Sequence, residues 1–312
     1  MDLCADQLLA HLPADLVTPT DLKTPFRRRF QRLPVLGRAN VAFNADRLVN
    51  RHLALPAFLK RQAGRFDLFH IVDHSYAHVV GELPPGRAGV YCHDLDAFRC
   101  LLDPARDPRP WWFRRLAAGT LRGLRSAAVV FHNSLDVGRQ LLATGLVGAD
   151  KLVHAPLGVA AEFTPTPMVA PAPIGTPADV PGRRFVLHVG SHIPRKRIDV
   201  LLDVFAAVRE RTPDLRLVQV GPVWSGAFAE RIARLGIGPA VTQVRGLSRE
   251  QLAELYRRAA VVLVPSEAEG FGLPVVEALA CGCPVVASDI PTLCEAGGAA
   301  ADYAPVGDVQ AW

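Results

Sequence analysis

Short apolar runs alternate with amphipathic stretches along most of this chain. The apolar runs are rich in Val, Phe and Leu and fit strands buried on both faces, whereas the amphipathic stretches fit surface helices. In the first half, the strand-like runs are residues 66–72, 88–93 and 127–133, and the helical stretches are 3–12, 48–63, 111–124 and 135–144. Such alternation predicts an α/β fold with a parallel sheet covered by helices.

The same alternation is more regular in the second half and predicts a doubly wound, Rossmann-like domain. The strand-like runs are 185–190, 215–221, 241–245, 261–265, 284–287 and 301–304, and the helical stretches are 198–211, 227–235 and 249–258. Ligands of such domains bind beyond the carboxyl ends of the strands. Polar and glycine-rich segments that follow strands should therefore form one site, namely Gly190-Ser191, Gly221-Pro222, Arg245-Gly246 and 266–272.

A proline-rich segment separates the two halves. Residues 164–182 read TPTPMVAPAPIGTPADVPG, which holds six prolines and a single charged residue. Domain boundaries fall in such segments. For 312 residues we therefore predict an N-terminal domain at 1–163, a linker at 164–183 and a C-terminal domain at 184–312.

Composition narrows the class of protein. The chain is 50% hydrophobic and 21% charged, without an apolar run long enough to span a membrane, a signal-peptide pattern or a nucleic-acid-binding module. Its six cysteines are scattered and fit free thiols in the cytoplasm. The net charge of +5 gathers partly in Arg27-Arg28-Arg29 and around 111–115. The basic, aromatic segment is either a solvated face or a peripheral contact with anionic lipid headgroups.

Most of the chemical signal lies in residues 261–288, VVLVPSEAEGFGLPVVEALACGCPVVAS. A buried strand leads into a loop with Glu267 and Glu269, and Gly270-Phe271-Gly272 then opens a helix that carries Glu277. The unpaired N–H groups at a helix N-terminus favour an anion such as a diphosphate. Glu277 lies too deep in the helix to cap it and is placed to accept hydrogen bonds from ligand hydroxyls. The alternative is two solvated glutamates.

Glu269 and Glu277 resemble the E-x7-E signature of the retaining GT-B glycosyltransferases known as group 1, which use nucleotide-sugar donors. The surrounding EGFGLPVVEALACGCPVVAS is similar to that family nearly residue for residue. The resemblance implies two Rossmann-like domains that face each other across a cleft. It places Glu269 beside the transferred sugar and Glu277 on the ribose, with Gly270, Phe271, Gly272 and Leu273 lining the donor.

A second element of the resemblance joins the first strand of the C-terminal domain to its helix. Gly190-Ser191-His192-Ile193-Pro194-Arg195-Lys196-Arg197 is similar to G-x-x-x-P-R-K, whose cations neutralise the donor diphosphate. Arg195 and Lys196 take that role by position, whereas Arg197 departs from the family pattern and receives none. Gly246 and Leu247 are expected beside the base.

The N-terminal domain contributes one residue to the expected site. Tyr91-Cys92-His93-Asp94-Leu95 is similar to an element whose histidine faces the donor sugar, so His93 joins Glu269, Arg195 and Lys196 as catalytic. Asp94 and Asp96 form a D-x-D, but nothing else resembles the metal-dependent architecture, so no metal or other cofactor is expected. His74 and His78 lack an H-E-x-x-H pattern and fit a polar surface.

The resemblance implies retaining sugar transfer from a nucleoside-diphosphate sugar to a hydroxyl of a glycan, lipid-linked or small-molecule acceptor. The expected setting is cell-envelope or polysaccharide biosynthesis, in the cytoplasm or peripherally at the inner face of the membrane. Two alternatives stay open: an inactive or split nucleotide-sugar-binding module, and another GT-B enzyme such as an epimerase or phosphorylase. Against the family, both ends are expected to be short, without a first strand before Met1 and closing helices after Trp312.

Overall fold

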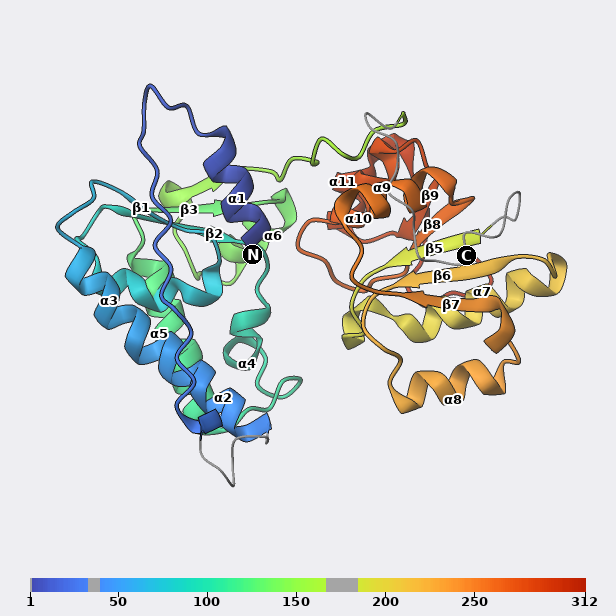
Figure 1. Ribbon diagram of the computed structural model, residues 1–312, viewed down its shortest axis with the longest axis horizontal. Helices are drawn as coiled ribbons and strands as arrows, with labels where there is room; N and C mark the ends of the chain where they lie inside the picture. Colours follow the sequence, from blue (N-terminus) through green and yellow to red (C-terminus); the bar gives the residue numbers. More distant parts are fainter. Residues whose placement is uncertain (1, 33–39, 167–184) are drawn as a thin grey trace. The chain divides into compact units, whose positions relative to one another are not determined.

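The structure, a computed structural model, describes residues 2–32, 40–166 and 185–312 (Figure 1). It divides into two compact units, Met1–Ala155 and Pro156–Trp312. Most of the predicted linker, 164–183, lies outside the described residues, so its conformation stays a prediction. Phe163, which ends the predicted N-terminal domain, packs in the core of the second unit.

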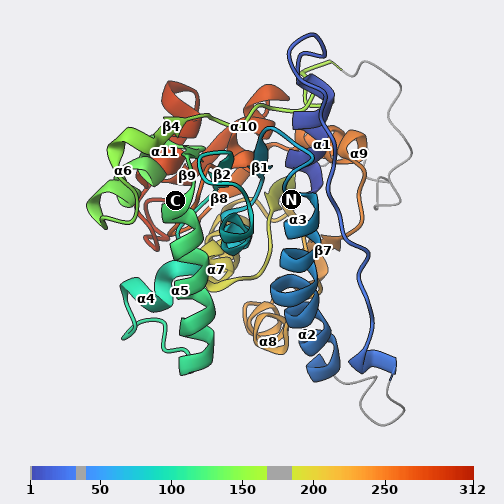
Figure 2. The ribbon, with the colours of Figure 1, turned by 90° about the vertical axis from the view of Figure 1, so that its left-hand side faces the viewer.

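The first unit contains a parallel sheet with the strand order β1-β2-β3-β4. The strands are β1 (Phe69–Ile71), β2 (Ala88–Cys92), β3 (Val129–His132) and β4 (Leu152–His154). The helices are α1 (Asp2–His11), α2 (Asn40–Val49), α3 (Leu55–Gln62), α4 (Arg99–Leu102), α5 (Trp111–Ser126) and α6 (Leu135–Ala143). A π-helical turn, Asn50–Ala54, joins α2 to α3, and the two helices form one rod in Figure 2.

Alternating burial positions the first sheet. Ala88, Val90 and Cys92 of β2 are buried, whereas the two residues between them are half-buried. Because side chains alternate across a strand, this pattern directs one face of β2 into the core. Phe98 and Leu124 are fully buried in the same core.

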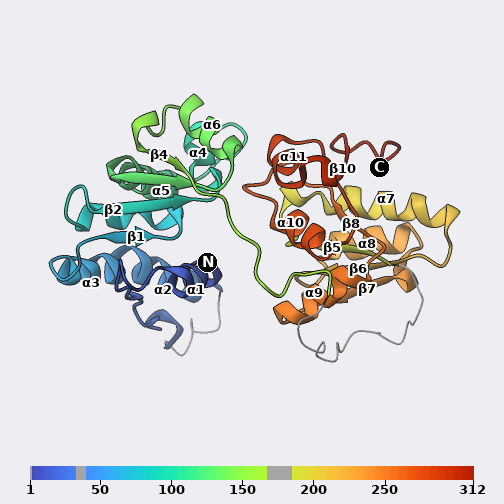
Figure 3. The ribbon, with the colours of Figure 1, turned by 90° about the horizontal axis from the view of Figure 1, so that it is seen from above.

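The second unit contains a six-stranded parallel sheet with the order β10-β9-β8-β5-β6-β7 (Figure 3). Its strands are β5 (Phe185–Val189), β6 (Arg216–Val220), β7 (Val241–Val244), β8 (Val261–Val264), β9 (Val285–Ser288) and β10 (Asp302–Ala304). Its helices are α7 (Ile198–Arg211), α8 (Gly226–Arg234), α9 (Arg249–Arg258), α10 (Leu273–Ala280) and α11 (Pro291–Gly297). The predicted doubly wound α/β architecture of this part is confirmed.

Two apolar cores, one on each face, hold the second sheet. Val186 packs with side chains of α7 and α8, whereas its neighbour Leu187 packs with those of α9, α10 and α11. A strand that is buried on both faces has a continuous apolar sequence. The strand at β5 was predicted from such a sequence. The chain winds outward from β5 through β6 to β7, and then crosses back to β8. The topological switch point, where such sheets bind ligands, therefore lies between β5 and β8.

Candidate functional site

Two loops meet at this switch point. The first follows β5 and carries Arg195 and Lys196 in a short 3₁₀ turn, and the second follows β8 and carries Glu269. The backbone N–H of Glu267 donates to the Arg195 carbonyl at 2.8 Å, and the Arg195 guanidinium donates to the Ala268 carbonyl at 2.8 Å. These hydrogen bonds join the loops directly, so the two predicted motifs lie together.

Glu269 is the centre of a charged cluster in which three side chains donate to its carboxylate. Arg195 Nη1 donates to Oε2 at 3.2 Å, the Lys196 ammonium donates to Oε1, and the Ser266 hydroxyl donates to Oε1 at 2.7 Å. The Glu269 side chain is only 6% exposed. Two cations and one carboxylate leave one net positive charge, which can attract an anion to this cluster. Ser266 was expected only as the first residue of the loop 266–272, and its contact with Glu269 was not predicted.

Arg197 is directed elsewhere. Its backbone has φ +48°, in the left-handed region, and its guanidinium donates to Asp199 at 2.9 Å and lies 3.6 Å from Glu267. Of its two ion-pair partners, Asp199 lies in the first turn of α7 and Glu267 lies in the loop after β8. Its charge therefore fixes the start of α7 and is separate from the Glu269 cluster.

Glu277 has a different partner. On α10, its carboxylate accepts a hydrogen bond from the hydroxyl of the fully buried Tyr256 at 3.0 Å. Burial raises the pKa of Glu277 to about 7, while the bond from Tyr256 opposes the shift. Glu277 can therefore change protonation near neutral pH, and it can accept hydrogen bonds from hydroxyl groups when ionised. Tyr256 was not assigned from the sequence.

The helix that carries Glu277 starts at a glycine. Gly272 precedes α10 with φ +96°, and a Cβ there would lie 2.9 Å from the Leu293 side chain. Both constraints require glycine at this turn. Gly270 and Phe271 precede it and Leu273 begins the helix, so the predicted donor-lining residues surround the N-terminus of α10.

The remaining predicted donor residues flank the same sheet edge. Gly190 and the exposed Ser191 follow β5, while Gly246 and Leu247 lie between β7 and α9. Gly246 has φ +67° with open space around its Cα, and Leu247 packs at the edge of the core.

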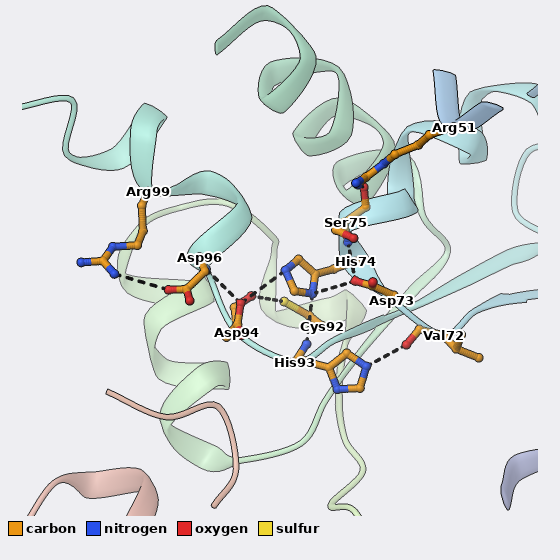
Figure 4. Close-up of polar contacts among 10 residues, drawn as sticks. All are labelled: Arg51, Val72, Asp73, His74, Ser75, Cys92, His93, Asp94, Asp96 and Arg99. Atoms are coloured by element: carbon orange, nitrogen blue, oxygen red, sulfur yellow. Dashed lines mark hydrogen bonds and ion pairs between the residues drawn. The ribbon is translucent and has the colours of Figure 1, made fainter. Parts of the chain in front are cut away.

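His93 lies in the first unit, just after β2 (Figure 4). Its Nε2 donates to the Val72 carbonyl at 2.7 Å, and its backbone N–H donates to His74 Nδ1 at 3.2 Å. Because a carbonyl only accepts, the proton of the neutral His93 ring is on Nε2, which leaves Nδ1 as its acceptor. The prediction that His74 lies on a polar surface is wrong, because His74 is only 4% exposed. Its ring lies between Asp73 and Asp94 and accepts the hydrogen bond from the His93 backbone.

Neither a metal cluster nor a membrane-spanning helix is found in the part of the chain that the structure describes. Among those residues, no group of three or more His, Cys, Asp or Glu side chains is arranged to hold a metal ion. Asp94 instead lies 3.6 Å from the His74 ring, and Asp96 lies 3.6 Å from Arg99. Within the same residues, every helix is too short or too polar to cross a bilayer.

Part of the chain is similar in sequence to a known protein family and to several curated proteins. Residues 177–302 match the family described as "Glycosyl transferases group 1". A D-inositol 3-phosphate glycosyltransferase from Nocardiopsis dassonvillei is 37% identical over 54% of this chain and 41% of its own length. One from Arthrobacter sp. is 32% identical over 75% of this chain and 56% of its own length. The matches to the first five such relatives span between 26% and 41% of those proteins.

Several solved structures are similar in fold to most of this chain. Sucrose-phosphate synthase from Thermosynechococcus elongatus gives a TM-score of 0.67 at 23% identity, covering 84% of this chain and 67% of that one. Anabaena HepE in complex with UDP-glucose gives 0.65 at 20% identity, covering 84% and 71%. These similarities show that the chain has the GT-B fold. The family match is narrower: it makes residues 177–302 similar to the group 1 glycosyl transferases.

Proposed function

We propose that the chain belongs to an enzyme that transfers a sugar from a nucleoside-diphosphate sugar to an acceptor hydroxyl, with retention of anomeric configuration. The observation that supports this most strongly is the cluster of Arg195, Lys196 and Glu269 at the switch point. A diphosphate requires concentrated positive charge, and a sugar requires a hydrogen-bond acceptor beside it. The cluster offers both within one crevice.

Diphosphate binding changes the partners within this cluster. The phosphate oxygens replace the Glu269 carboxylate as acceptors for the Arg195 guanidinium and the Lys196 ammonium. Glu269 is then released to accept hydrogen bonds from hydroxyls of the attached sugar. As the bond between sugar and phosphate breaks, negative charge grows on the leaving diphosphate, and the two fixed cations stabilise it most at that moment.

The rest of the donor is assigned to the neighbouring loops. Gly270, Phe271 and Gly272, which precede α10, are assigned to the sugar and the phosphates, because the helix dipole favours an anion at a helix N-terminus. Glu277 accepts from the ribose hydroxyls, with Tyr256 holding its carboxylate.

Five further residues are assigned to the donor. Gly190 and Ser191 line the phosphate side, while Gly246 and Leu247 meet the base through backbone groups. We also assign His93, from the first unit, to the donor: its Nδ1 can accept a hydrogen bond from a sugar hydroxyl.

The acceptor is a hydroxyl compound, either a glycan, a lipid-linked sugar or a small molecule. The N-terminus of α5 supports a lipid-associated acceptor, because Trp111 is 77% exposed and Trp112 and Phe113 are exposed beside it. Arg114 and Arg115 follow in the same turn. Exposed Trp side chains beside arginines suit the headgroup region of an anionic membrane, which fits a cytoplasmic protein at the inner face of the membrane.

Donor turnover tests the proposed reaction. The chain is incubated with UDP-, GDP- and ADP-sugars and a panel of hydroxyl acceptors, and release of nucleoside diphosphate is measured together with NMR of the anomeric proton in the product. Acceptor-dependent release with an unchanged anomeric configuration supports the proposal. Inversion at the anomeric carbon contradicts retention, and a product without a new glycosidic bond indicates an epimerase or phosphorylase. Tight donor binding by calorimetry without turnover indicates a binding module.

A further inference from the structure

His188 lies at the switch point and interrupts the sheet there. The ladder between β5 and β6 continues to Val189↔Val220, whereas the ladder between β5 and β8 contains only two pairs, Val186↔Val261 and Leu187↔Val262. At the next residue, the His188 ring is 1% exposed and its Nδ1 lies 3.0 Å from the Leu263 carbonyl on β8. A hydrogen bond from the His188 side chain thus links β5 to β8 beyond the last pair of the backbone ladder.

That hydrogen bond fixes the tautomer of His188. A carbonyl oxygen only accepts, so Nδ1 carries the proton, and Nε2 of the neutral ring is an acceptor. Nε2 is buried and has no hydrogen-bond partner among the described residues. Buried acceptors without a partner are uncommon because they lose hydration without compensation, so this nitrogen needs an explanation.

The free nitrogen lies beside the proposed phosphate loop. A Cβ on Gly190 would lie 3.2 Å from His188 Nε2 and 3.9 Å from Lys196 Cδ. Nε2 and the Lys196 side chain therefore flank the same glycine. Because residue 190 is a glycine, it places no side chain of its own between the nitrogen and the lysine stem.

Burial keeps His188 neutral, and the neighbouring cation adds to this effect. Burial lowers the pKa of His188 to about 4, and the Lys196 ammonium and His192 lower it further, against the Leu263 hydrogen bond and Glu269, which raise it. The ring therefore presents a neutral acceptor to a cation over the ordinary pH range. A charged imidazolium in this place would repel Lys196 instead.

We propose that His188 is a positioning residue for Lys196, and that its Nε2 accepts a hydrogen bond from the Lys196 ammonium when a diphosphate is bound. The inference rests on the proposed function. In the structure the ammonium donates to Glu269. Once a diphosphate releases Glu269, His188 provides a second, neutral acceptor that holds the ammonium toward the phosphate without competing for its charge.

Two substitutions separate this role from a structural one. In His188→Asn the amide nitrogen occupies the place of Nδ1 and can still donate to Leu263, but the Nε2 acceptor is lost. In His188→Gln the amide reaches the place of Nε2 and can supply an acceptor oxygen. We expect His188→Asn to bind UDP, GDP or inorganic diphosphate on the order of tenfold more weakly than wild type, and His188→Gln to recover most of that affinity.

A double-mutant cycle shows whether His188 acts through Lys196. Diphosphate affinity is measured by calorimetry for wild type, His188→Asn, Lys196→Ala and the double variant, with the melting temperature of each as a control for folding. If the inference holds, His188→Asn has almost no further effect once Lys196 is alanine. Independent, additive losses overturn it, and so does a His188→Asn variant with wild-type affinity. If wild-type protein binds none of the three probes, the proposed function fails as well.

A measurement on wild-type protein does not depend on how the variants fold. The ¹⁵N chemical shifts of the His188 ring, assigned through the backbone resonances, report which nitrogen carries the proton. We expect the Nδ1–H tautomer without ligand, and a change in the Nε2 shift on saturation with inorganic diphosphate that signals a new hydrogen bond. An Nε2–H tautomer, an imidazolium near neutral pH or an Nε2 shift unaffected by bound diphosphate contradicts the proposal.

Discussion

Replacing Glu269 by glutamine should strengthen the binding of a nucleoside diphosphate while it slows transfer. In the structure the Glu269 carboxylate forms ion pairs with both Arg195 and Lys196. A diphosphate has to displace that carboxylate before it can bind the cations. Glutamine keeps the shape of the side chain but removes the charge, so it competes less and leaves the site with two uncompensated positive charges.

The size of the effect follows from the bonds that are exchanged. Hydrogen bonds to charged groups contribute about 1.5–3 kcal/mol, and a neutral amide retains part of that. A net gain of roughly 1.4 kcal/mol corresponds to about tenfold tighter binding of UDP or GDP. Transfer should fall on the order of 10²-fold, because the variant loses a charged contact with the sugar. Without nucleotide, the variant should also be less stable, since two half-buried cations lose their charged partner.

The three effects are measured separately. Calorimetry with UDP and GDP gives the affinity, melting temperatures with and without nucleotide give the stability, and donor turnover gives the rate of transfer. Glu267→Gln is a matched control: that carboxylate is two residues away, 45% exposed, and contacts Arg197 instead. It should leave nucleotide affinity within about twofold of wild type. Weaker nucleotide binding by Glu269→Gln than by wild type would refute the reasoning, because it would mean that the carboxylate does not compete with the diphosphate.

Three further predictions concern protonation and the surface. Nucleotide affinity, measured by calorimetry, should fall below about pH 7 as Glu277 takes up a proton. In Tyr256→Phe the fall should begin at higher pH, because the hydrogen bond that lowers the pKa of Glu277 is gone. Identical pH profiles of wild type and variant would contradict this prediction. Because the pKa of His188 falls from 6.5 to about 4 on folding, protonation favours the unfolded chain. Unfolding by urea should therefore show up to about 3 kcal/mol of stability lost between about pH 6.5 and about pH 4, and less in His188→Gln; equal losses would contradict it. Trp111→Ala with Trp112→Ala should reduce co-sedimentation with anionic phosphatidylglycerol vesicles several-fold, and unchanged binding would argue against membrane contact.

The sequence predicted long, strongly patterned elements best. The helices expected at 198–211 and 249–258 are α7 and α9 with the same bounds, because each has a regular apolar face and a defined start. The capping box of Ser248 and Gln251 accounts for the start of α9. β4, at Leu152–His154, was missed because three mostly exposed residues carry no periodic signal. α11, at Pro291–Gly297, was missed because seven residues are too few to display helical periodicity.

The candidate site was predictable where sequence order determines geometry. Loops after neighbouring parallel strands must meet, so Arg195, Lys196 and Glu269 were expected together, and they are in contact. The roles given to them stay predictions. Contacts made by residues inside apolar patterns could not be predicted this way. His188 was counted only as part of a strand-like run, because a strand pattern does not indicate where a ladder ends.

The central claim is that the Arg195, Lys196 and Glu269 cluster binds the diphosphate of a sugar donor. Calorimetric titration of UDP, GDP and their sugar conjugates into wild type, Lys196→Ala and the control Lys60→Ala, an exposed lysine on α3, tests it most directly. We predict that at least one nucleotide binds wild type and Lys60→Ala equally, and binds Lys196→Ala at least about tenfold more weakly. Equal affinity of the same nucleotide for all three proteins would contradict the claim.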